Sequence, residues 1–308
     1  MSITVLGSYI HAHCLGVHGL PQSGESMMAD CLWSNFGGKG LNLALGLNQL
    51  GVDVYTLLAV GVDAEVQGLQ AYLHTVGLNT DGLTIVDDRS GFGVGLVSTH
   101  GENMIVIYPG ANHLLNAQHI YQATARIQAS QLVCAQFELL DEPIMAAFTL
   151  AKQAGVKTLL NPSPWRAIPS ELLGLTDILV LNYTEAVAFF NLDIKQIIDW
   201  QAVLTQYIGQ GELVIVTLGE QGCVAYHAQY GYCAQAAWTI QQVDATGAGD
   251  AFTVGLMYAL MHNQTLAETL SWANACGAIV ASQRGVAEVL PDVATLEAFV
   301  NSVRSNVK

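Results

Sequence analysis

The sequence has few charged residues, and very few of these are basic. Charged residues make up 11% of the 308 residues, with ten Lys and Arg against 25 Asp and Glu, so the formal net charge is −15. Nucleic acids and anionic lipid surfaces attract proteins through a positive field, which this composition does not supply. We therefore expect neither nucleic acid nor a membrane as a partner. The hydrophobic share of 52% instead indicates a globular protein with a large core.

Targeting segments and paired cysteines are also missing. The first residues, Met1–Gly7, carry no basic region and no small-residue cleavage site, so we expect no signal peptide. No apolar run has the length and composition of a transmembrane helix. The six cysteines are scattered and form no CxxC pair, which indicates reduced thiols and a cytoplasmic location.

Three common catalytic signatures are absent. There is no G-x-x-x-x-G-K-[ST], which argues against a P-loop ATPase. No G-x-G-x-x-G follows the first predicted strand and there is no G-x-S-x-G elbow, which argues against a dinucleotide-dependent dehydrogenase and an α/β-hydrolase. The run His11-x-His13-Cys14 places adjacent side chains on opposite faces of a strand, a poor geometry for a transition-metal site.

Short apolar runs alternate with amphipathic segments along most of the chain. Helical spacing predicts helices over Ala64–Val76 and Glu142–Ala154, the second closed by Gly155. The predicted strands are Ile3–Leu6, Val54–Val60, Leu132–Ala135, Lys157–Leu160, Ile178–Leu181 and Leu213–Leu218. Several are apolar on both faces, as in the interior of a parallel sheet. The alternation predicts one doubly wound α/β domain over 1–308, with a mostly parallel sheet flanked by helices.

Two regions depart from this alternation. Residues 9–36 show no clear helix, and residues 91–110 contain a predicted hairpin. In that hairpin, Val94–Thr99 and Met104–Tyr108 flank a turn at His100–Asn103. Together the two regions predict a small β-sheet lid beside the main sheet.

The sharpest chemical signal is Gly247-Ala248-Gly249-Asp250. It follows a strand-like segment, Ala234–Ile240, and precedes an apolar helix predicted from Ala251 to about Met261. Glycines let the backbone approach a ligand closely, and the first N–H groups of a helix form an anion site. A carboxylate placed there is suited to accept a proton from an attacking hydroxyl. The alternative is that Asp250 only caps the helix.

Two further motifs place polar groups at predicted helix starts. Gly37-Gly38-Lys39-Gly40 precedes a predicted helix, and Lys39 is one of only ten basic residues, which favours a ligand contact over a plain glycine turn. Asn182 and Glu185 follow the predicted strand Ile178–Leu181, at the edge where open α/β sheets bind ligands. Helix capping by Asn182 or Thr184, with Glu185 in the first turn, is the alternative interpretation.

Taken in order, these motifs resemble the ribokinase (PfkB) family of carbohydrate kinases. The resemblance runs from Gly7 to about Pro291, nearly the whole chain. It rests on Gly7-Ser8, Phe36-Gly37-Gly38-Lys39-Gly40-x-Asn42, Gly110-Ala111-Asn112, Gln136-Phe137-Glu138, Asn161-Pro162, Asn182-x-x-Glu185, Thr217-Leu218-Gly219 and Asp244-x-Thr246-Gly247-Ala248-Gly249-Asp250. Each motif is weak alone, and their shared order makes the match specific.

The resemblance implies an ATP- and Mg²⁺-dependent kinase. Asp250 is expected to accept the proton of a primary hydroxyl as that hydroxyl attacks the γ-phosphate. The other implied roles are an anion hole at Gly247, Ala248 and Gly249, sugar contacts at Gly38, Lys39, Asn42 and Glu138, water-mediated Mg²⁺ contacts at Asn182 and Glu185, and nucleotide contacts at Thr217, Gly219, Gly222 and Asn274. Lids in related enzymes often pair, so we expect a homodimer through the lid.

The sequence departs from the family where the sugar is held. Ribokinases continue as G-S-x-N-x-D, whereas this chain has Ile10 and Ala12 at the two polar positions, so ribose has lost its usual carboxylate partner. On a strand, residues 10 and 12 share one face while His11 and His13 share the other. A one-residue bulge would turn the histidines toward the substrate, and His11 is therefore a candidate substrate contact.

A second departure concerns a monovalent cation. Asp244 and Thr246 are retained on one side of the place where the resemblance implies a K⁺ site. On the other side, Val289 replaces the serine of ribokinases. Backbone carbonyls could still supply most ligands, so activation by K⁺ stays open.

Three functions fit these observations. The first is an ATP-dependent kinase that phosphorylates a primary hydroxyl of a sugar or sugar-like molecule. The second is a nucleoside kinase of the same family, because the apolar Ile10 and Ala12 suit a bulky aglycone. The third is a non-catalytic sugar-binding or regulatory protein on the same scaffold, against which the retention of Asp250 with both glycines argues.

Overall fold

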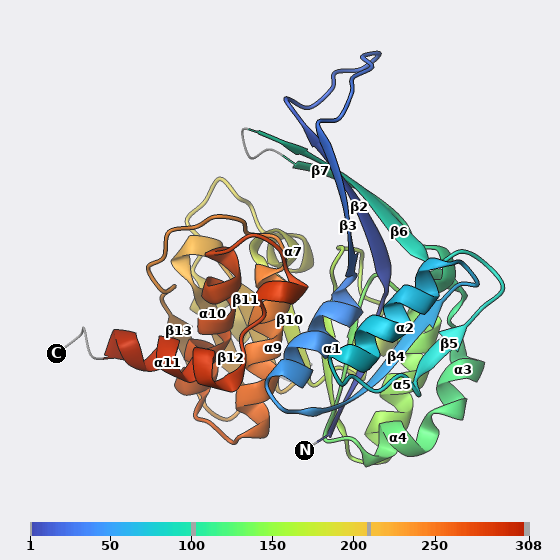
Figure 1. The fold of residues 1–308 in the computed structure, drawn as a ribbon. Coiled ribbons are helices and arrows are strands. Elements are labelled where there is room, and N and C mark those ends of the chain that lie inside the picture. The colour runs from blue at the N-terminus through green and yellow to red at the C-terminus, as the bar shows by residue number, and fades with distance from the viewer. Residues whose placement is uncertain (1, 100–102, 208–210, 305–308) are drawn as a thin grey trace.

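A large, mostly parallel sheet forms the centre of the molecule. The computed structural model describes residues 2–99, 103–207 and 211–304, and in these the strand order is β13-β12-β11-β10-β9-β8-β1-β4-β5 (Figure 1). The strands are β1 (Ser2–Leu6), β4 (Asp53–Val60), β5 (Leu83–Ile85), β8 (Leu132–Gln136), β9 (Lys157–Asn161), β10 (Ile178–Asn182), β11 (Leu213–Thr217), β12 (Cys223–His227) and β13 (Gly231–Gln235). Only β12 and β13, at one edge, pair antiparallel. The predicted α/β fold class is confirmed.

Helices cover both faces of this sheet. On one face lie α1 (Lys39–Gln49), α2 (Glu65–Thr75), α9 (Ala248–Met261), α10 (Leu266–Ala281) and α11 (Val293–Arg304). On the other lie α3 (Ala117–Gln122), α4 (Thr124–Ala129), α5 (Asp141–Gln153), α6 (Ser170–Gly174), α7 (Tyr183–Phe189) and α8 (Trp200–Thr205). Among the helices described, none is long and apolar enough to cross a membrane.

Each strand of the sheet interior contributes to two hydrophobic cores. In β1, Ile3 and Val5 point into the core with α1 and α9, while Leu6 points into the core with α5. In β8, Cys134 belongs to the first core and Val133 to the second. All five side chains are fully buried. Because successive side chains of a strand face opposite ways, burial on both faces explains the uninterrupted apolar runs in the sequence.

A second, four-stranded sheet, which we call the lid sheet, rises from one end of the large sheet (Figure 1). Its order is β3-β2-β6-β7, with β2 (Ile10–Val17), β3 (Cys31–Gly37), β6 (Gly91–Ser98) and β7 (Asn103–Tyr108). The hairpin expected between residues 91 and 108 is present as β6 and β7, which pair antiparallel. Most of its predicted turn, at His100–Asn103, lies outside the described residues.

The segment before α9 differs from its prediction. The expected strand at Ala234–Ile240 ends at Gln235, and 236–247 form no strand. The reason is tertiary: the amide of Asn274 in α10 donates to the carbonyl oxygens of Gln235 and Ala236, at 3.3 and 3.2 Å. A side chain thus takes the hydrogen bonds that a neighbouring strand would have made.

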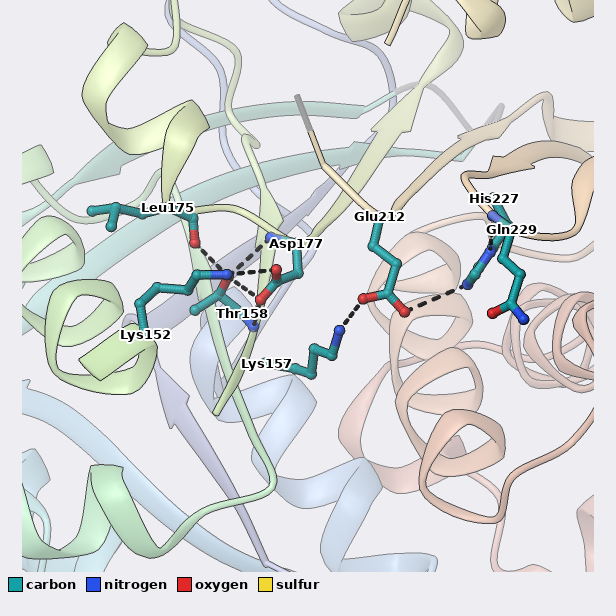
Figure 2. A network of polar contacts seen from close by, with 8 residues as sticks. All are labelled: Lys152, Lys157, Thr158, Leu175, Asp177, Glu212, His227 and Gln229. Atoms are coloured by element: carbon teal, nitrogen blue, oxygen red, sulfur yellow. Dashed lines mark hydrogen bonds and ion pairs between the residues drawn. The ribbon is translucent and has the colours of Figure 1, made fainter. Parts of the chain in front are cut away.

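At the amino ends of the strands, polar groups satisfy one another (Figure 2). Lys152 Nζ lies 2.7 Å from Asp177 Oδ1, and Asp177 Oδ2 accepts a hydrogen bond of 3.0 Å from the backbone N–H of Thr158. Next to them, Glu212 accepts from Lys157 and lies 3.5 Å from His227 Nε2. These contacts extend from β9 to β12, and they pair the polar side chains at this end of the sheet with one another.

The two halves of this network should contribute unequally to stability. Asp177→Ala removes the acceptor of a largely buried backbone N–H as well as an ion pair, so we expect the free energy of unfolding to fall by about 1–3 kcal/mol. Lys157→Ala breaks a pair whose partners are 50% and 38% exposed, and should cost less than about 1 kcal/mol. Urea denaturation of both variants measures the difference. Equal losses would contradict the assignment.

Candidate active site

The helix α9 begins at a glycine whose backbone no other residue adopts easily. Gly247 has φ 76°, and a Cβ added there would lie 2.4 Å from Cγ1 of Val286. Gly249, by contrast, has open space around it, with nothing within 4 Å of an added Cβ. The first glycine is therefore required by the turn, while the second leaves the helix start open to a ligand.

The N–H groups at this helix start are only partly free. Ala248 N–H donates to the carbonyl oxygen of Ala245 at 3.2 Å and is therefore part of the turn. The resemblance implied instead that the N–H groups of Gly247, Ala248 and Gly249 would together form the anion hole. Across the described residues, the N–H groups of Gly247, Gly249 and Asp250 have no acceptor. Such free N–H groups at the amino end of a 14-residue helix attract an anion.

Asp250 lies in the first turn of α9 and is 7% exposed. Its Oδ2 accepts a hydrogen bond of 2.8 Å from the amide of Asn42, and its Oδ1 lies 3.5 Å from Nζ of Lys39. The charge of Asp250 raises the pKa of Lys39 against the opposing effect of burial, so the amine stays protonated. The interpretation of Asp250 as a helix cap is wrong, because Gly247 is the N-cap and has no side-chain cap.

Glu138 joins this group from the loop after β8. Its Oε2 accepts a 2.9 Å hydrogen bond from the backbone N–H of Lys39 and another from the hydroxyl of Ser8. Ser8 follows β1, and its carbonyl oxygen accepts from Leu41 N–H. The amino end of α1 is thereby fixed to the carboxyl ends of two central strands.

Asn182 and Glu185 form a capping box at the start of α7. Asn182 Oδ1 accepts from Glu185 N–H, and Glu185 Oε2 accepts from Asn182 N–H, both at 2.9 Å. Glu185 is only 3% exposed, and burial raises the pKa of its carboxyl group, against which hydrogen bonds from Asn182 and Ser163 act. The capping alternative is confirmed, but it does not exclude a ligand role, because both residues also border a cavity.

The cavity has a volume of about 230 Å³ and lies at the carboxyl ends of β9, β10 and β11. It brings together predicted site residues from four segments of the chain: Lys39, Asn182, Glu185, Thr217, Gly249 and Asp250. Asn161, Ser163 and Thr253 line it as well and were not among the predicted site residues. Asn161 ends β9, at the same sheet edge as Asn182, which is the signal that could have identified it.

The remaining predicted nucleotide contacts lie on the β11–β13 side. Gly222 has φ 96°, and a Cβ there would lie 2.1 Å from the carbonyl oxygen of Gln235, so two chain segments meet at this glycine. Gly219 has φ 60° and open space beside it. Asn274 is buried and uses its amide to hold Gln235 and Ala236, as described above.

The predicted cation residues form a local turn. Asp244 Oδ1 accepts a 2.9 Å hydrogen bond from the N–H of Thr246. The N–H groups of Val243 and Asp244 both donate to the carbonyl oxygen of Ala281. Within the described residues, no group of three or more His, Cys, Asp or Glu could hold a metal ion.

The structure does not bring His11 to this cavity. The registers of β2 with β3 and with β6 run without interruption, so the proposed bulge is wrong. The His11 ring lies 5.7 Å from the ring of Phe36, which in turn lies 5.5 Å from Tyr72 of α2. His11 therefore packs toward α2, and burial lowers its pKa. Ile10 lies on the opposite face, against Gly93 of β6.

Comparison with known proteins agrees with this geometry. A family model described as pfkB family carbohydrate kinase matches residues 2–293. The chain belongs to the pfkB family. This membership confirms the resemblance found in the sequence and the expected class of enzyme, an ATP-dependent carbohydrate kinase. The alternative of a non-catalytic protein on the same scaffold loses its support.

Individual pfkB family members are similar over almost their full length. A ribokinase of Haemophilus influenzae is 29% identical over 297 residues, covering 94% of this chain and 95% of its own. A deoxyribokinase of Salmonella typhi is 29% identical over 255 residues, covering 82% and 83%. The structure of Arabidopsis thaliana ribokinase complexed with ribose and ATP is 25% identical with a TM-score of 0.89, covering 97% and 98%.

The two glycines of the α9 turn should respond differently to an added methyl group. Gly247→Ala meets Val286 and a positive φ, so we expect a loss of about 1–3 kcal/mol in the free energy of unfolding. Gly249→Ala meets nothing and should not reduce stability. Thermal unfolding of the matched pair measures this contrast, and an equal loss in Gly249→Ala would contradict it.

Proposed function

We propose that this enzyme transfers the γ-phosphate of ATP to a primary hydroxyl of a sugar or sugar-like molecule, with Asp250 as the general base. The observation that carries the proposal is the placement of a buried carboxylate beside the free N–H groups of Gly247 and Gly249. A base and an anion site at one helix start are the two components that phosphoryl transfer to an alcohol needs.

The proposed chemistry assigns a separate task to each group. An oxygen of Asp250 accepts the proton of the attacking hydroxyl, while Asn42 and Lys39 orient the carboxylate. The free N–H groups of Gly247 and Gly249 stabilise negative charge on the transferred phosphoryl group. Lys39, Asn42, Gly38 and Glu138 border the acceptor, and the ammonium group of Lys39 adds a positive charge between Asp250 and the phosphate.

A hard cation fits the other side of the cavity. Glu185 offers a buried carboxylate, and Asn161 and Asn182 add amide groups at the same sheet edge, a set of oxygen donors that suits Mg²⁺ with retained waters. Bound Mg²⁺ would neutralise charge on the phosphate oxygens. The nucleotide would extend from there past Thr217, Gly219 and Gly222, toward Asn274.

A site for a monovalent cation is a separate proposal. Asp244 Oδ1 accepts a hydrogen bond from the N–H of Thr246, and Asp244 Oδ2 would be a ligand for a K⁺ ion. Val289 offers no side-chain oxygen, so the other ligands would be backbone carbonyls. We also propose that the chain works in the cytoplasm as one domain with its lid, and the six free cysteines support a reducing compartment.

A nucleoside kinase is the second candidate within the same chemistry. The observation that favours it is the apolar pair Ile10 and Ala12 at the base of the lid sheet, where a polar sugar finds no charged partner. A panel of pentoses, 2-deoxy sugars, hexoses and nucleosides, measured by coupled ADP release, separates the two. Turnover with nucleosides alone would replace the sugar-kinase proposal.

Loss of the base should remove turnover and spare binding. Asp250→Asn keeps an oxygen for the amide of Asn42 but cannot accept a proton, so kcat should fall by about 10²–10⁴-fold with the best substrate of the panel. ATP binding, measured by calorimetry, should persist. Asp193→Asn, at an exposed turn, is the control and should leave kcat unchanged. Near-normal turnover in Asp250→Asn would refute the assignment.

We further propose that the enzyme is a homodimer through its lid sheets. β7 is an edge strand, and its five apolar side chains from Met104 to Tyr108 are between 46% and 68% exposed. An exposed apolar edge strand is unfavourable in a monomer and pairs readily with another chain. A second copy of this chain would cover it.

Charge introduced on β7 should therefore dissociate the enzyme. Val106 is 68% exposed. In Val106→Asp, the carboxylates of the two subunits would repel each other at a twofold contact, and we expect a monomer by light scattering. Ile194→Asp alters a similarly exposed side chain, 66%, that is not part of the lid sheet, and should leave the mass unchanged. A monomeric wild-type protein would contradict the proposal.

A further inference from the structure

Arg166 holds the loop on which Glu138 lies. Its Nη1 donates to the carbonyl oxygen of Phe137 and its Nη2 to that of Leu139, both at 2.7 Å. These two residues flank Glu138 on either side. The guanidinium group also lies 3.8 Å from the centre of the Phe137 ring and pairs with Asp141 at 2.6 Å. One side chain thus fixes the backbone of the loop on both sides of a single glutamate.

The fixed glutamate connects to the base through α1. Glu138 accepts the N–H of Lys39 at 2.9 Å and the hydroxyl of Ser8. Lys39 and Asn42, in the first turns of the same helix, hold the carboxylate of Asp250. Arg166 does not line the cavity, and the loop of Glu138, which it contacts directly, links it to the proposed acceptor site.

The chain segment that carries Arg166 also reaches the part of the cavity next to Glu185, where we propose that Mg²⁺ binds. Ser163, three residues before Arg166, lines the cavity and hydrogen-bonds Glu185, and its carbonyl oxygen accepts Phe137 N–H at 3.0 Å. The stretch from Ser163 to Arg166 therefore contacts the carboxyl group of Glu185 and the backbone of the two residues that flank Glu138. Among the described residues, the hydrogen bonds and the ion pair of Arg166 are with residues 137–141, at the Glu138 end.

The geometry requires a guanidinium group. Two carbonyl oxygens and a carboxylate are reached at once by a planar fork of N–H donors that also stacks on a ring. A lysine ammonium group would keep the charge but could not serve all of these positions from one place. The positive charge of Arg166 is paired with the carboxylate of Asp141.

We propose that Arg166 is a positioning residue for Glu138, which sets how tightly the acceptor alcohol is held without contacting it. The inference rests on the proposed function, in which Glu138 borders the acceptor. It also predicts that the affinity for the acceptor depends on Arg166, whereas the affinity for ATP does not.

The test compares Arg166→Met and Arg166→Lys with Arg126→Met. Arg126 is a matched control, since it too lies over an aromatic ring, Tyr55, and pairs with an acidic residue, but on the far side of the molecule from the cavity. With the best acceptor of the panel, both Arg166 variants should raise the acceptor KM by about 10-fold or more, the range for a lost charged hydrogen bond. The ATP KM should change by less than about two-fold.

A double variant tests whether the effect of Arg166 on the acceptor is transmitted by Glu138. If Arg166 acts through Glu138, adding Arg166→Met to Glu138→Gln should raise the acceptor KM no further. Thermal unfolding shows which variants are folded, and Arg166→Lys carries the test if Arg166→Met does not fold. An unchanged acceptor KM, an equal rise in both KM values, or additive effects with Glu138→Gln would overturn the inference. Absence of transfer by the wild-type enzyme to every panel alcohol would instead overturn the proposed function.

Discussion

The site depends on one interaction, in which α1 and α9 hold a buried carboxylate between their amino ends. Asp250 and Asn42 are 208 residues apart in the chain and join at 2.8 Å. An ionised carboxylate removed from water is costly unless it has partners, and here an amide and an ammonium group supply them. The start of α9 also leaves N–H groups without an acceptor among the described residues. The proposed base and the proposed anion site thus lie at one helix start.

The large sheet makes this contact possible because the polar groups at the two ends of its strands have different roles. At the amino ends of the strands, residues such as Asp177 and Glu212 find partners among themselves, and that edge is closed. At the carboxyl ends, Asn161, Asn182 and Thr217 face a cavity instead. Parallel strands put all their carboxyl ends at one edge, so loops distant in sequence converge there.

Several residues serve the fold and the site together. Asn182 and Glu185 satisfy the first backbone groups of α7 and also border the cavity, so a capping signature in a sequence does not exclude a ligand role. Asn274 ends a strand by taking its carbonyl hydrogen bonds beside the proposed nucleotide site. Arg166 was overlooked because its contacts are with backbone carbonyls, which no sequence pattern reveals.

The sequence by itself determined the fold class, the order of the motifs and the candidate for the base, since alternating apolar runs and glycines before helices are local signals. Tertiary structure alone decided that the amide of Ala248 belongs to a turn and that His11 packs on Phe36, away from the cavity. It also decided that Asp250 is held by Asn42 and Lys39 rather than capping α9. These outcomes depend on contacts between segments far apart in the chain, and no local pattern contains them.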